Sequence, residues 1–234
     1  MELFTYYRST SSYRVRIALA LKGLDYQAVP VNLLVPAGGE HRQPAYLAIN
    51  PQGRVPALRT DEGCVLTQSP AIIEYLEERY PQVALLSADL ATRAHERGVA
   101  ALVACDIHPL HNVSVLNRLR QLGQDEEQVV EWIGHWIGQG LAAIEQLIGD
   151  EGYCFGAQPG LADVYLIPQL YAAQRFGVQM AAYPRIARVA ALAEQHPAFI
   201  LAHPANQPDT PARSHRTLSR RDMSETLKTA QAYS

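Results

Sequence analysis

The chain has little of several features that would point to other classes of protein. Its three cysteines, Cys64, Cys105 and Cys154, are far apart, and an odd, scattered set predicts neither a disulfide framework nor a zinc site. A formal net charge of −3 excludes a global basic field for nucleic acid. There is no run of about 18 apolar residues to span a membrane and no leader-like start. We therefore expect a protein of the reducing cytoplasm.

What the sequence does have is 48% hydrophobic residues and a change of pattern after residue 81. Short alternating segments before that point predict strands, and helical spacing dominates beyond it. The predicted strands are 2–6, 26–31, 55–59 and 64–67. The predicted helices are 13–22, 69–79, 89–120, 125–149, 161–176 and 183–195.

This order of elements predicts two domains. A strand, a helix and a strand within about 30 residues form a βαβ unit, so the first two strands should be parallel. Strands grouped before helices favour an α/β domain over 1–81 and an all-helical domain over 88–209. Residues 210–234 are polar and lack apolar periodicity, which predicts a flexible tail, with a short helix near 223–227.

Hydroxyl side chains gather where the first strand meets the first helix. Residues 8–14 read RSTSSYR, with four hydroxyls in succession. The start of a helix presents unpaired N–H groups and a positive dipole end, so it can stabilise a thiolate or another anion. Taken alone, the same residues also fit an ordinary serine N-cap.

A second motif, NPQGRVPAL at 50–58, combines a turn with a proline that enters a strand. A cis bond between Val55 and Pro56 is one solution, and it would turn the Val55 backbone toward a bound peptide. An edge-strand proline is the plainer alternative.

A third motif, Gln68-Ser69-Pro70, opens the predicted helix 69–79. Ser69 is a good N-cap and Pro70 suits the first helical position. Capping does not explain Gln68, so a ligand carboxylate held by Gln68 and Ser69 is a second reading.

Together these motifs resemble those of the glutathione transferases, and among them the zeta class, the maleylacetoacetate isomerase family. The helical half agrees through ACDIHPLHN at 104–112 and LADVYLIPQ at 161–169. The resemblance covers about residues 1–209. It implies a thioredoxin-like N-terminal domain that holds glutathione and a helical C-terminal domain that completes the substrate site.

The resemblance also implies roles for particular residues. Ser9 matches the serine that hydrogen-bonds the thiol, and Thr10 matches the next serine. Ser11 stands where the family motif has cysteine, so chemistry peculiar to that cysteine should be absent. The implied catalytic residues are Ser9, Ser11 and Arg8. The other implied glutathione-binding residues are Thr10, His41, Val55, Gln68, Ser69, His108 and Asn112.

The substrate side rests on fewer matches. Arg8 and Arg175 match basic residues expected to hold substrate carboxylates, and Ser114 stands where some relatives carry arginine. His108 and Asn112 are four residues apart, which would place them on one face of the predicted long helix. His108 and His111 have no third ligand at useful spacing, so we expect no metal.

The activity implied is glutathione-dependent cis–trans isomerisation of a maleyl keto-acid, most directly maleylacetoacetate to fumarylacetoacetate in tyrosine and phenylalanine catabolism. A homodimer is expected, with no nucleic-acid or membrane partner. Three alternatives stay open: a maleylpyruvate isomerase, a transferase acting on α-halo acids, and a non-enzymatic glutathione-binding module, because fold does not fix function.

Overall fold

The computed structural model describes residues 1–35 and 38–211. Four short strands form one sheet in the order β2-β1-β3-β4. The strands are β1 (Glu2–Thr5), β2 (Gln27–Pro30), β3 (Ala57–Arg59) and β4 (Val65–Thr67). The pairing of β1 with β2 is parallel, which confirms the predicted βαβ unit, whereas β3 pairs antiparallel with β1 and with β4. Residues 212–234 of the predicted tail, including the short helix expected within it, lie outside the described residues.

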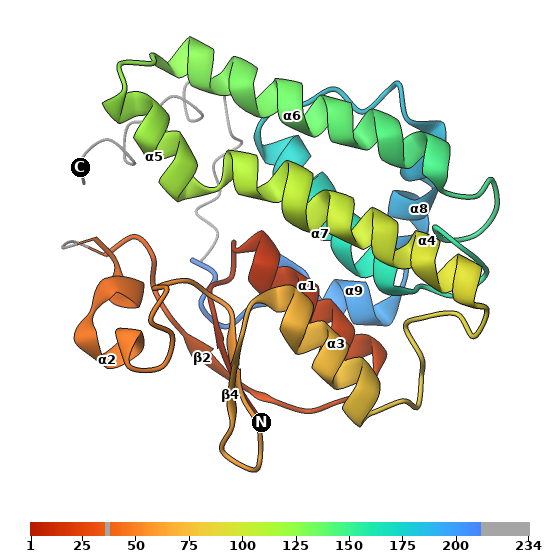
Figure 1. Ribbon diagram of the computed structural model, residues 1–234, viewed down its shortest axis with the longest axis horizontal. Helices are drawn as coiled ribbons and strands as arrows, with labels where there is room; N and C mark the ends of the chain where they lie inside the picture. Colours follow the sequence, from red (N-terminus) through yellow and green to blue (C-terminus); the bar gives the residue numbers. More distant parts are fainter. Residues whose placement is uncertain (36–37, 212–234) are drawn as a thin grey trace.

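The two faces of this sheet contact different parts of the protein. Neighbouring strand residues point to opposite faces, so Leu3 joins the large buried cluster whereas Phe4 joins a smaller one with Tyr46. The larger cluster includes residues of α1 (Thr10–Leu21) and α3 (Ser69–Arg79), which lie between the sheet and the helical half (Figure 1). The smaller cluster packs under α2 (Pro44–Leu47), a short helix that is absent from the predicted set.

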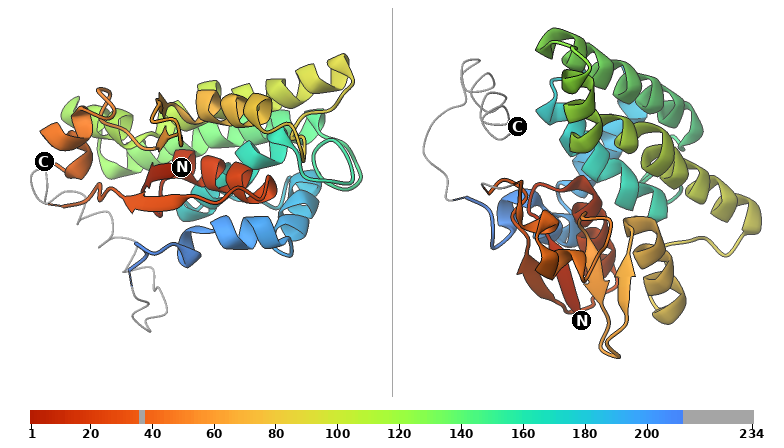
Figure 2. Two further views of the ribbon diagram at one scale, coloured as in Figure 1. Left: turned by 90° about the horizontal axis from the view of Figure 1, so that it is seen from below. Right: turned by 60° about the vertical axis from the view of Figure 1, so that its left-hand side comes forward.

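In the described chain, the elements after α3 are all helices, and Figure 2 shows α4 to α7 beyond α1 and α3, whereas the last α-helix, α9, returns beside α1. Helix α7 lies at the centre of this helical layer, because most of its residues are buried. Apolar residues of the sheet, α1 and the helical layer form one continuous core. The helices after α3 are α4 (Leu90–Ala101), α5 (Val113–Gln121), α6 (Glu126–Leu147), α7 (Leu161–Arg175), α8 (Pro184–Ala193) and α9 (Pro197–Ala202).

The predicted continuous helix 89–120 is wrong in its middle. After α4 the chain makes a π-helical stretch, Leu102–Ile107, and then a 3-10 turn, His108–His111. Pro109 has no N–H to donate, and Asn112 is extended (ψ 143°) while its side chain caps α5 by accepting from the Ser114 N–H. His108 and Asn112 therefore do not share a helical face.

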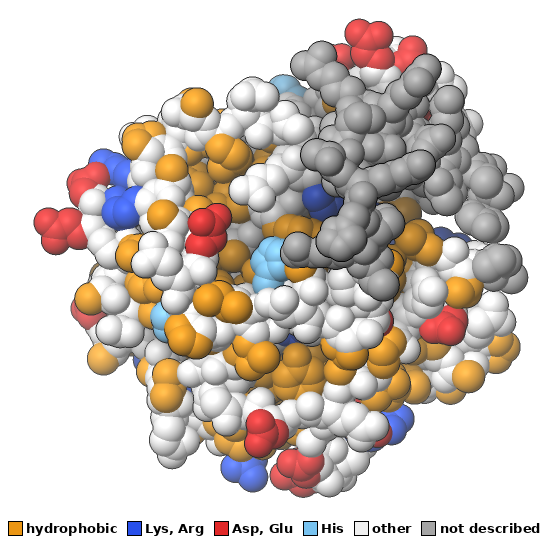
Figure 3. Space-filling view, turned by 180° about the vertical axis from the view of Figure 1, so that it is seen from behind, with side chains coloured by type: hydrophobic (Ala, Val, Ile, Leu, Met, Phe, Trp, Pro, Cys, Tyr) orange, Lys and Arg blue, Asp and Glu red, His pale blue; other side chains and the backbone are white. Residues whose placement is uncertain are grey.

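By length and composition alone, Leu90–Gln121 would also qualify as a membrane-crossing helix. Its buried residues, among them Val99, Val103 and Ile107, instead belong to the protein's own core. The π-helical stretch lies close against α6, because a side chain on Gly140 would come within 2.2 Å of Ile107. In the most apolar stretch of Leu90–Gln121, 33% of the residues are buried within the described chain. On the side of the molecule seen in Figure 3, apolar and uncharged side chains occupy much of the centre and most charges lie toward the edges.

The C-terminal end of the described chain returns to the first loop. Arg16 on α1 is fully buried. It donates to the carbonyl oxygens of Ala202 (3.0 Å), in α9, and Tyr7 (2.9 Å). The Tyr7 N–H donates to the Asp209 carboxylate at 2.8 Å. These contacts fix the loop that joins β1 to α1 from behind.

Candidate active site

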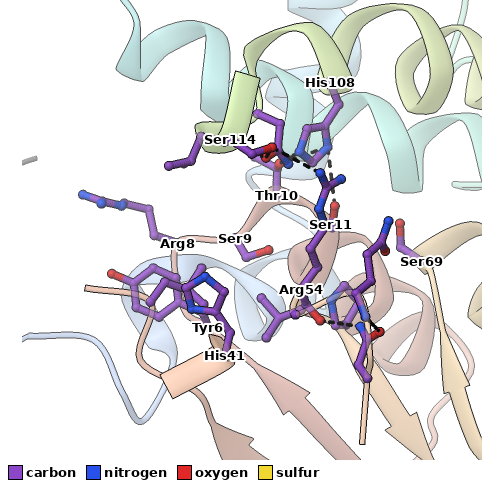
Figure 4. Close-up of a pocket in the computed structure, with 18 of the residues that line it drawn as sticks. Tyr6, Arg8, Ser9, Thr10, Ser11, His41, Arg54, Ser69, His108 and Ser114 are labelled. Atoms are coloured by element: carbon purple, nitrogen blue, oxygen red, sulfur yellow. Dashed lines mark hydrogen bonds between the residues drawn. The ribbon is translucent and has the colours of Figure 1, made fainter. Parts of the chain in front are cut away.

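A cavity of about 610 Å³ opens between the sheet-bearing half and the helical half. All the residues singled out from the sequence line it, although they come from segments far apart in the chain. Figure 4 shows Ser9, Thr10 and Ser11 at the start of α1, with His108 and Ser114 above them and Tyr6 and His41 below. The predicted site residues on the cavity wall are Arg8, Ser9, Thr10, Ser11, His41, Val55, Gln68, Ser69, His108, Asn112, Ser114 and Arg175.

Ser9 is the N-cap of α1. Its Oγ accepts a hydrogen bond from the Ser12 N–H at 3.2 Å, so the plain capping interpretation is correct. A hydroxyl can accept and donate at once. The O–H of Ser9 therefore still has its hydrogen to offer to an anion in the cavity, next to the positive end of α1.

The turn before β3 supplies the backbone of Val55. The Val55–Pro56 peptide bond is cis, as predicted. The carbonyl oxygen of Arg54 accepts from the Asn50 amide at 2.6 Å and from the Tyr46 hydroxyl at 2.7 Å, which holds the turn in place. Val55 itself is 9% exposed and borders the cavity.

Gln68, and not Ser69, occupies the capping position of α3. Its backbone is left-handed (φ 69°), an uncommon conformation for a residue with a side chain, and Ser69 is already helical. The expected Ser69 cap is therefore wrong by one residue. The Gln68 amide donates to Gln52 at 2.6 Å, and the Ser69 hydroxyl accepts from Arg14 at 3.3 Å.

His41 lines the edge of the cavity and has one buried, unsatisfied nitrogen that lies beside Gly39. Its Nδ1 is buried and has no hydrogen-bond partner. Burial, with a contribution from Arg42, lowers the pKa of His41. A neutral imidazole nitrogen without a partner suits a polar ligand group.

On the helical side, His108 is held as a neutral side chain. Its Nδ1 lies 2.6 Å from Arg14 Nη2, and its Nε2 lies 3.3 Å from Thr10 Oγ1. Burial and the charge of Arg14 hold its pKa well below the usual value. His108 stacks on His111 at 5.2 Å, and burial lowers the pKa of His111 to about 4. Both rings are therefore uncharged near neutral pH.

The mouth of the cavity is positive. Arg54 reaches across from the sheet-bearing half and donates to the Ser114 hydroxyl at 3.1 Å. The Arg175 guanidinium lies over the rings of Tyr171 and Phe176, and its desolvation there, together with the field of Arg8, lowers its pKa, although much of the residue remains exposed. The described lining residues include four arginines and neither aspartate nor glutamate. Such a lining attracts anions.

Known proteins with this sequence pattern are enzymes of one family. The family model described as "Glutathione S-transferase, N-terminal domain" matches residues 3–84, and that of the C-terminal domain matches 137–192. Maleylacetoacetate isomerase of Pseudomonas aeruginosa is 79% identical over 212 residues, which is 91% of this chain and 100% of the relative. The chain belongs to the glutathione S-transferase family.

Solved structures agree with this assignment and place the chain in the zeta class. The holo structure of a bacterial zeta-class maleylpyruvate isomerase matches with a TM-score of 0.85 and 46% identity, over 90% of this chain and 100% of that one. Maleylacetoacetate isomerase of Anaeromyxobacter dehalogenans, solved with glutathione in its active site, matches with a TM-score of 0.81 and 43% identity, over 90% and 97%. The expected α/β plus all-α fold, with a thioredoxin-like domain followed by a helical one, is confirmed.

Sequence analysis missed two arginines of this glutathione S-transferase. Arg54 lies inside the quoted NPQGRVPAL motif and reaches the opposite wall. Arg14 contacts two cavity residues from behind. The sequence offered a sign that Arg14 is buried, because Arg14 and Arg16 stand among apolar residues of a predicted helix. Arginine is rarely buried unless its charge has a partner.

Among residues 1–35 and 38–211, no group of three or more His, Cys, Asp or Glu side chains is placed to hold a metal ion. Asp163 has a structural role: its carboxylate accepts from the N–H groups of Gly160 (2.8 Å) and Cys154 (3.0 Å) at the start of α7.

Proposed function

We propose that this enzyme isomerises the cis double bond of maleylacetoacetate to give fumarylacetoacetate, with glutathione as its coenzyme. The observation that carries the proposal is one cavity that combines hydroxyl groups at a helix start with four arginines, three from the sheet-bearing half and Arg175 from the helical half. The relative that is 79% identical carries the same activity in its name.

The cavity suits glutathione in size and chemistry. Its volume of about 610 Å³ falls within the range of small-molecule sites. We assign the peptide backbone of glutathione to Val55, the γ-glutamyl end to Gln68 and Ser69 at the start of α3, and the glycyl end to His41. His41 lines the same cavity.

Bound glutathione supplies a thiolate that adds to the double bond, lets the resulting single bond rotate, and leaves again unconsumed. The protein's part in this chemistry is to favour the thiolate over the thiol. Ser9 donates its O–H to the sulfur, and Ser11 and the N-terminus of α1 add further positive potential. Thr10, His108 and Asn112 line the boundary between the coenzyme and the substrate.

The arginines act on the substrate. Arg8 and Arg175 hold its carboxylates through charge-assisted hydrogen bonds. The same positive field stabilises the negative charge that develops on the substrate's carbonyl oxygen during the reaction. We propose the division of labour that the sequence suggests: residues 1–81 bind glutathione, and 88–209 complete the substrate site.

Maleylpyruvate is the second candidate substrate. The zeta-class structure with a TM-score of 0.85 belongs to a maleylpyruvate isomerase. Ser114 favours the longer keto-acid, because some relatives carry arginine at this position and serine leaves more room at the cavity mouth. Conjugation or dehalogenation of α-halo acids is a weaker alternative, since it does not require two carboxylate clamps.

The deciding experiment measures kcat/KM for maleylacetoacetate and for maleylpyruvate at saturating glutathione. We expect maleylacetoacetate to be preferred by about tenfold, the order of magnitude that one methylene group in a fitted pocket contributes to discrimination. A preference for maleylpyruvate would reassign the substrate. Failure to bind glutathione in a calorimetric titration would contradict the whole proposal.

The setting of the enzyme follows from its chemistry. A glutathione-dependent isomerase belongs in the reducing cytoplasm, and its product feeds tyrosine and phenylalanine catabolism. We also propose a homodimer. Sedimentation at micromolar concentration should give twice the chain mass of 25.8 kDa, and a species at the single-chain mass would contradict it.

A further inference from the structure

Arg14 is a buried cation directly behind the cavity. It is 2% exposed and projects from α1 toward the helical half. Its Nη1 donates to Ser69 Oγ at 3.3 Å, and its Nη2 lies 2.6 Å from His108 Nδ1. The guanidinium carbon lies 5.1 Å from the centre of the Tyr165 ring. Both hydrogen-bond partners are side chains that line the cavity.

The charge of Arg14 has no counter-ion in the described part of the chain. The ion pairs found there join other residues, and Arg14 Nε is buried without a hydrogen-bond partner. Burial lowers the pKa of Arg14 to about 10, so it remains charged at neutral pH. Leaving an unpaired charge in a protein interior is costly. A negative charge bound in the cavity would offset that cost.

The hydrogen bonds from Arg14 run in one direction, toward the cavity. Arginine can only donate, so His108 Nδ1 is the acceptor and the neutral ring carries its hydrogen on Nε2. Thr10 Oγ1 lies 3.3 Å from both ring nitrogens, and Ser11 Oγ lies 3.5 Å from Nδ1. Because the Nδ1 lone pair is already taken by Arg14 at 2.6 Å, only the Nε2–H is left to donate to Thr10. With its oxygen accepting from His108, Thr10 keeps its own O–H hydrogen to donate into the cavity that it lines.

We propose that Arg14 is a positioning residue that stabilises the glutathione thiolate through His108 and Thr10. Its charge polarises His108, fixes the Nε2–H tautomer, and so orients the Thr10 hydroxyl as a donor beside Ser9 and Ser11. Hydrogen bonds in such a chain strengthen one another in a water-poor interior. This inference rests on the proposed function, because the anion at the end of the chain is the coenzyme thiolate.

The other groups around Arg14 and His108 do not supply the missing negative charge. Burial raises the pKa of Tyr165, so that side chain stays protonated. Cys105 lies close enough to interact electrostatically with Arg14, but it is not a carboxylate and forms no ion pair with Arg14 in the described part of the chain. His111 is neutral, and Arg54 adds a second positive field at His108.

The first test needs no coenzyme. Imidazole nitrogen chemical shifts of the free protein should show His108 as the neutral Nε2–H tautomer throughout pH 6 to 8. Arg14→Met should abolish this tautomer preference, and Arg14→Lys, which keeps a charge and a donor, should restore it. A mixed tautomer in the native protein, or an Arg14→Met variant that keeps the preference, would overturn the proposal.

The second test measures the pKa of the bound thiol from thiolate absorbance in the near ultraviolet, without substrate. Arg14→Met should raise it by about one unit, which is about a tenfold loss of thiolate at a fixed pH below that value. Thr10→Val should raise it similarly, and the double variant should add nothing further, because both changes interrupt one chain. Additive shifts would mean that Arg14 acts through space and would contradict the relay.

Arg16→Met is the matched control for loss of a buried arginine. Arg16 lies on the same helix, and its bonds lead mainly to backbone carbonyls. It should lower the melting temperature like Arg14→Met but leave the His108 tautomer unchanged. Should Arg14→Met fail to fold, Thr10→Val alone tests the proposal. An unchanged pKa of the bound glutathione thiol in that variant would contradict the proposed chain of hydrogen bonds. Absence of glutathione binding to the native protein would instead refute the proposed function, while the tautomer measurement would still report on Arg14.

Discussion

The two walls of the cavity are built in different ways. The wall from the sheet-bearing half consists largely of groups held by local backbone geometry: the cap at Ser9, the turn before Val55, and left-handed Gln68. The wall from the helical half consists of side chains at helix ends, among them Arg175 at the end of α7 and Ser114 in the first turn of α5. Both Arg175 and Ser114 are exposed.

The difference explains how one family can keep a coenzyme and vary its substrate. Backbone positions change little when side chains are substituted, so the part of glutathione recognition that rests on backbone groups should tolerate most mutations, whereas the part that rests on hydroxyl side chains should not. Exposed side chains at helix ends can be exchanged without loss of packing. Substitutions on the first wall should therefore affect coenzyme chemistry, and substitutions on the second wall should affect the substrate.

The largest expected effect comes from the thiol-binding side. Ser9→Ala should lower kcat by roughly 10- to 1000-fold, the range seen when an activating donor is lost. Ser11→Ala should cost less than about tenfold, because neighbouring donors still cover the thiolate. Steady-state kinetics on both variants would test this order, and a larger loss from Ser11→Ala would move the thiolate deeper along α1.

Because Ser9 also caps α1, a second variant separates its two roles. Glycine at an N-cap costs only a few tenths of a kcal/mol. Ser9→Gly should therefore lose kcat as Ser9→Ala does while keeping nearly the native melting temperature. Native kcat in Ser9→Gly would show that Ser9 serves the helix alone.

His111, on the helical wall, should make the free energy of unfolding depend on pH. Burial lowers the pKa of His111 to about 4, whereas an unfolded histidine titrates near about 6.5. Between these values the unfolded chain binds a proton that the folded protein does not. The free energy of unfolding should therefore fall as the pH is lowered from about 6.5 toward 4, by about 3 kcal/mol from His111.

Urea titrations at a series of pH values would measure that slope, with buried His108 contributing in the same direction. His111→Gln should flatten the slope, even if it lowers stability at neutral pH by disturbing the pair with Gln169. His95→Gln is the control, because His95 is exposed and should leave the slope as it is. An unchanged slope in His111→Gln would mean that His111 titrates normally.

Arg175→Ala should separate substrate from coenzyme. Loss of a charge-assisted contact predicts a rise in KM for the dicarboxylate substrate of about tenfold or more, with the affinity for glutathione unchanged. Arg118→Ala, on α5 and outside the cavity lining, should alter neither quantity. If Arg175→Ala leaves KM unchanged, Arg8 becomes the principal clamp.

The smallest effect is expected where the two walls meet. The hydrogen bond from Arg54 to Ser114 is exposed, and such bonds contribute little. Ser114→Ala should change KM for substrate by less than about threefold, and Ser114→Thr, which keeps the hydroxyl, should change it less. A tenfold change from Ser114→Ala would show that Arg54 must be held by Ser114 in order to bind the substrate.

Sequence reasoning succeeded where a short motif dictates local geometry. The βαβ unit, the cis bond at Val55–Pro56 and the helix Ser69–Arg79 follow from turn residues, proline and periodicity close together in the chain. It failed where periodicity conceals a local break and where packing decides. The bend at Asn112 has local causes, Pro109 and the Asn112 cap, that the apolar periodicity of 89–120 conceals. The short helix α2 instead packs on residues from other strands, which periodicity does not record.

The candidate site divides along the same line. Residues within recognisable motifs were assigned to it from the sequence, and they do line one cavity. The role of Arg14 depends on its meeting His108, 94 residues later in the chain. Only the packing of the two halves brings these side chains together.

The anchoring of the first loop by Ala202 and Asp209 bears on how the enzyme is made. The N-terminal half leaves the ribosome before those residues have been synthesised. In that interval Arg16 has no Ala202 carbonyl to bind, and the Tyr7 N–H has no carboxylate. A nascent chain therefore already has every hydroxyl of the loop between β1 and α1, but the loop has not yet reached its final conformation. Coenzyme binding competence should arise late in biosynthesis, when the segment around Asp209 docks.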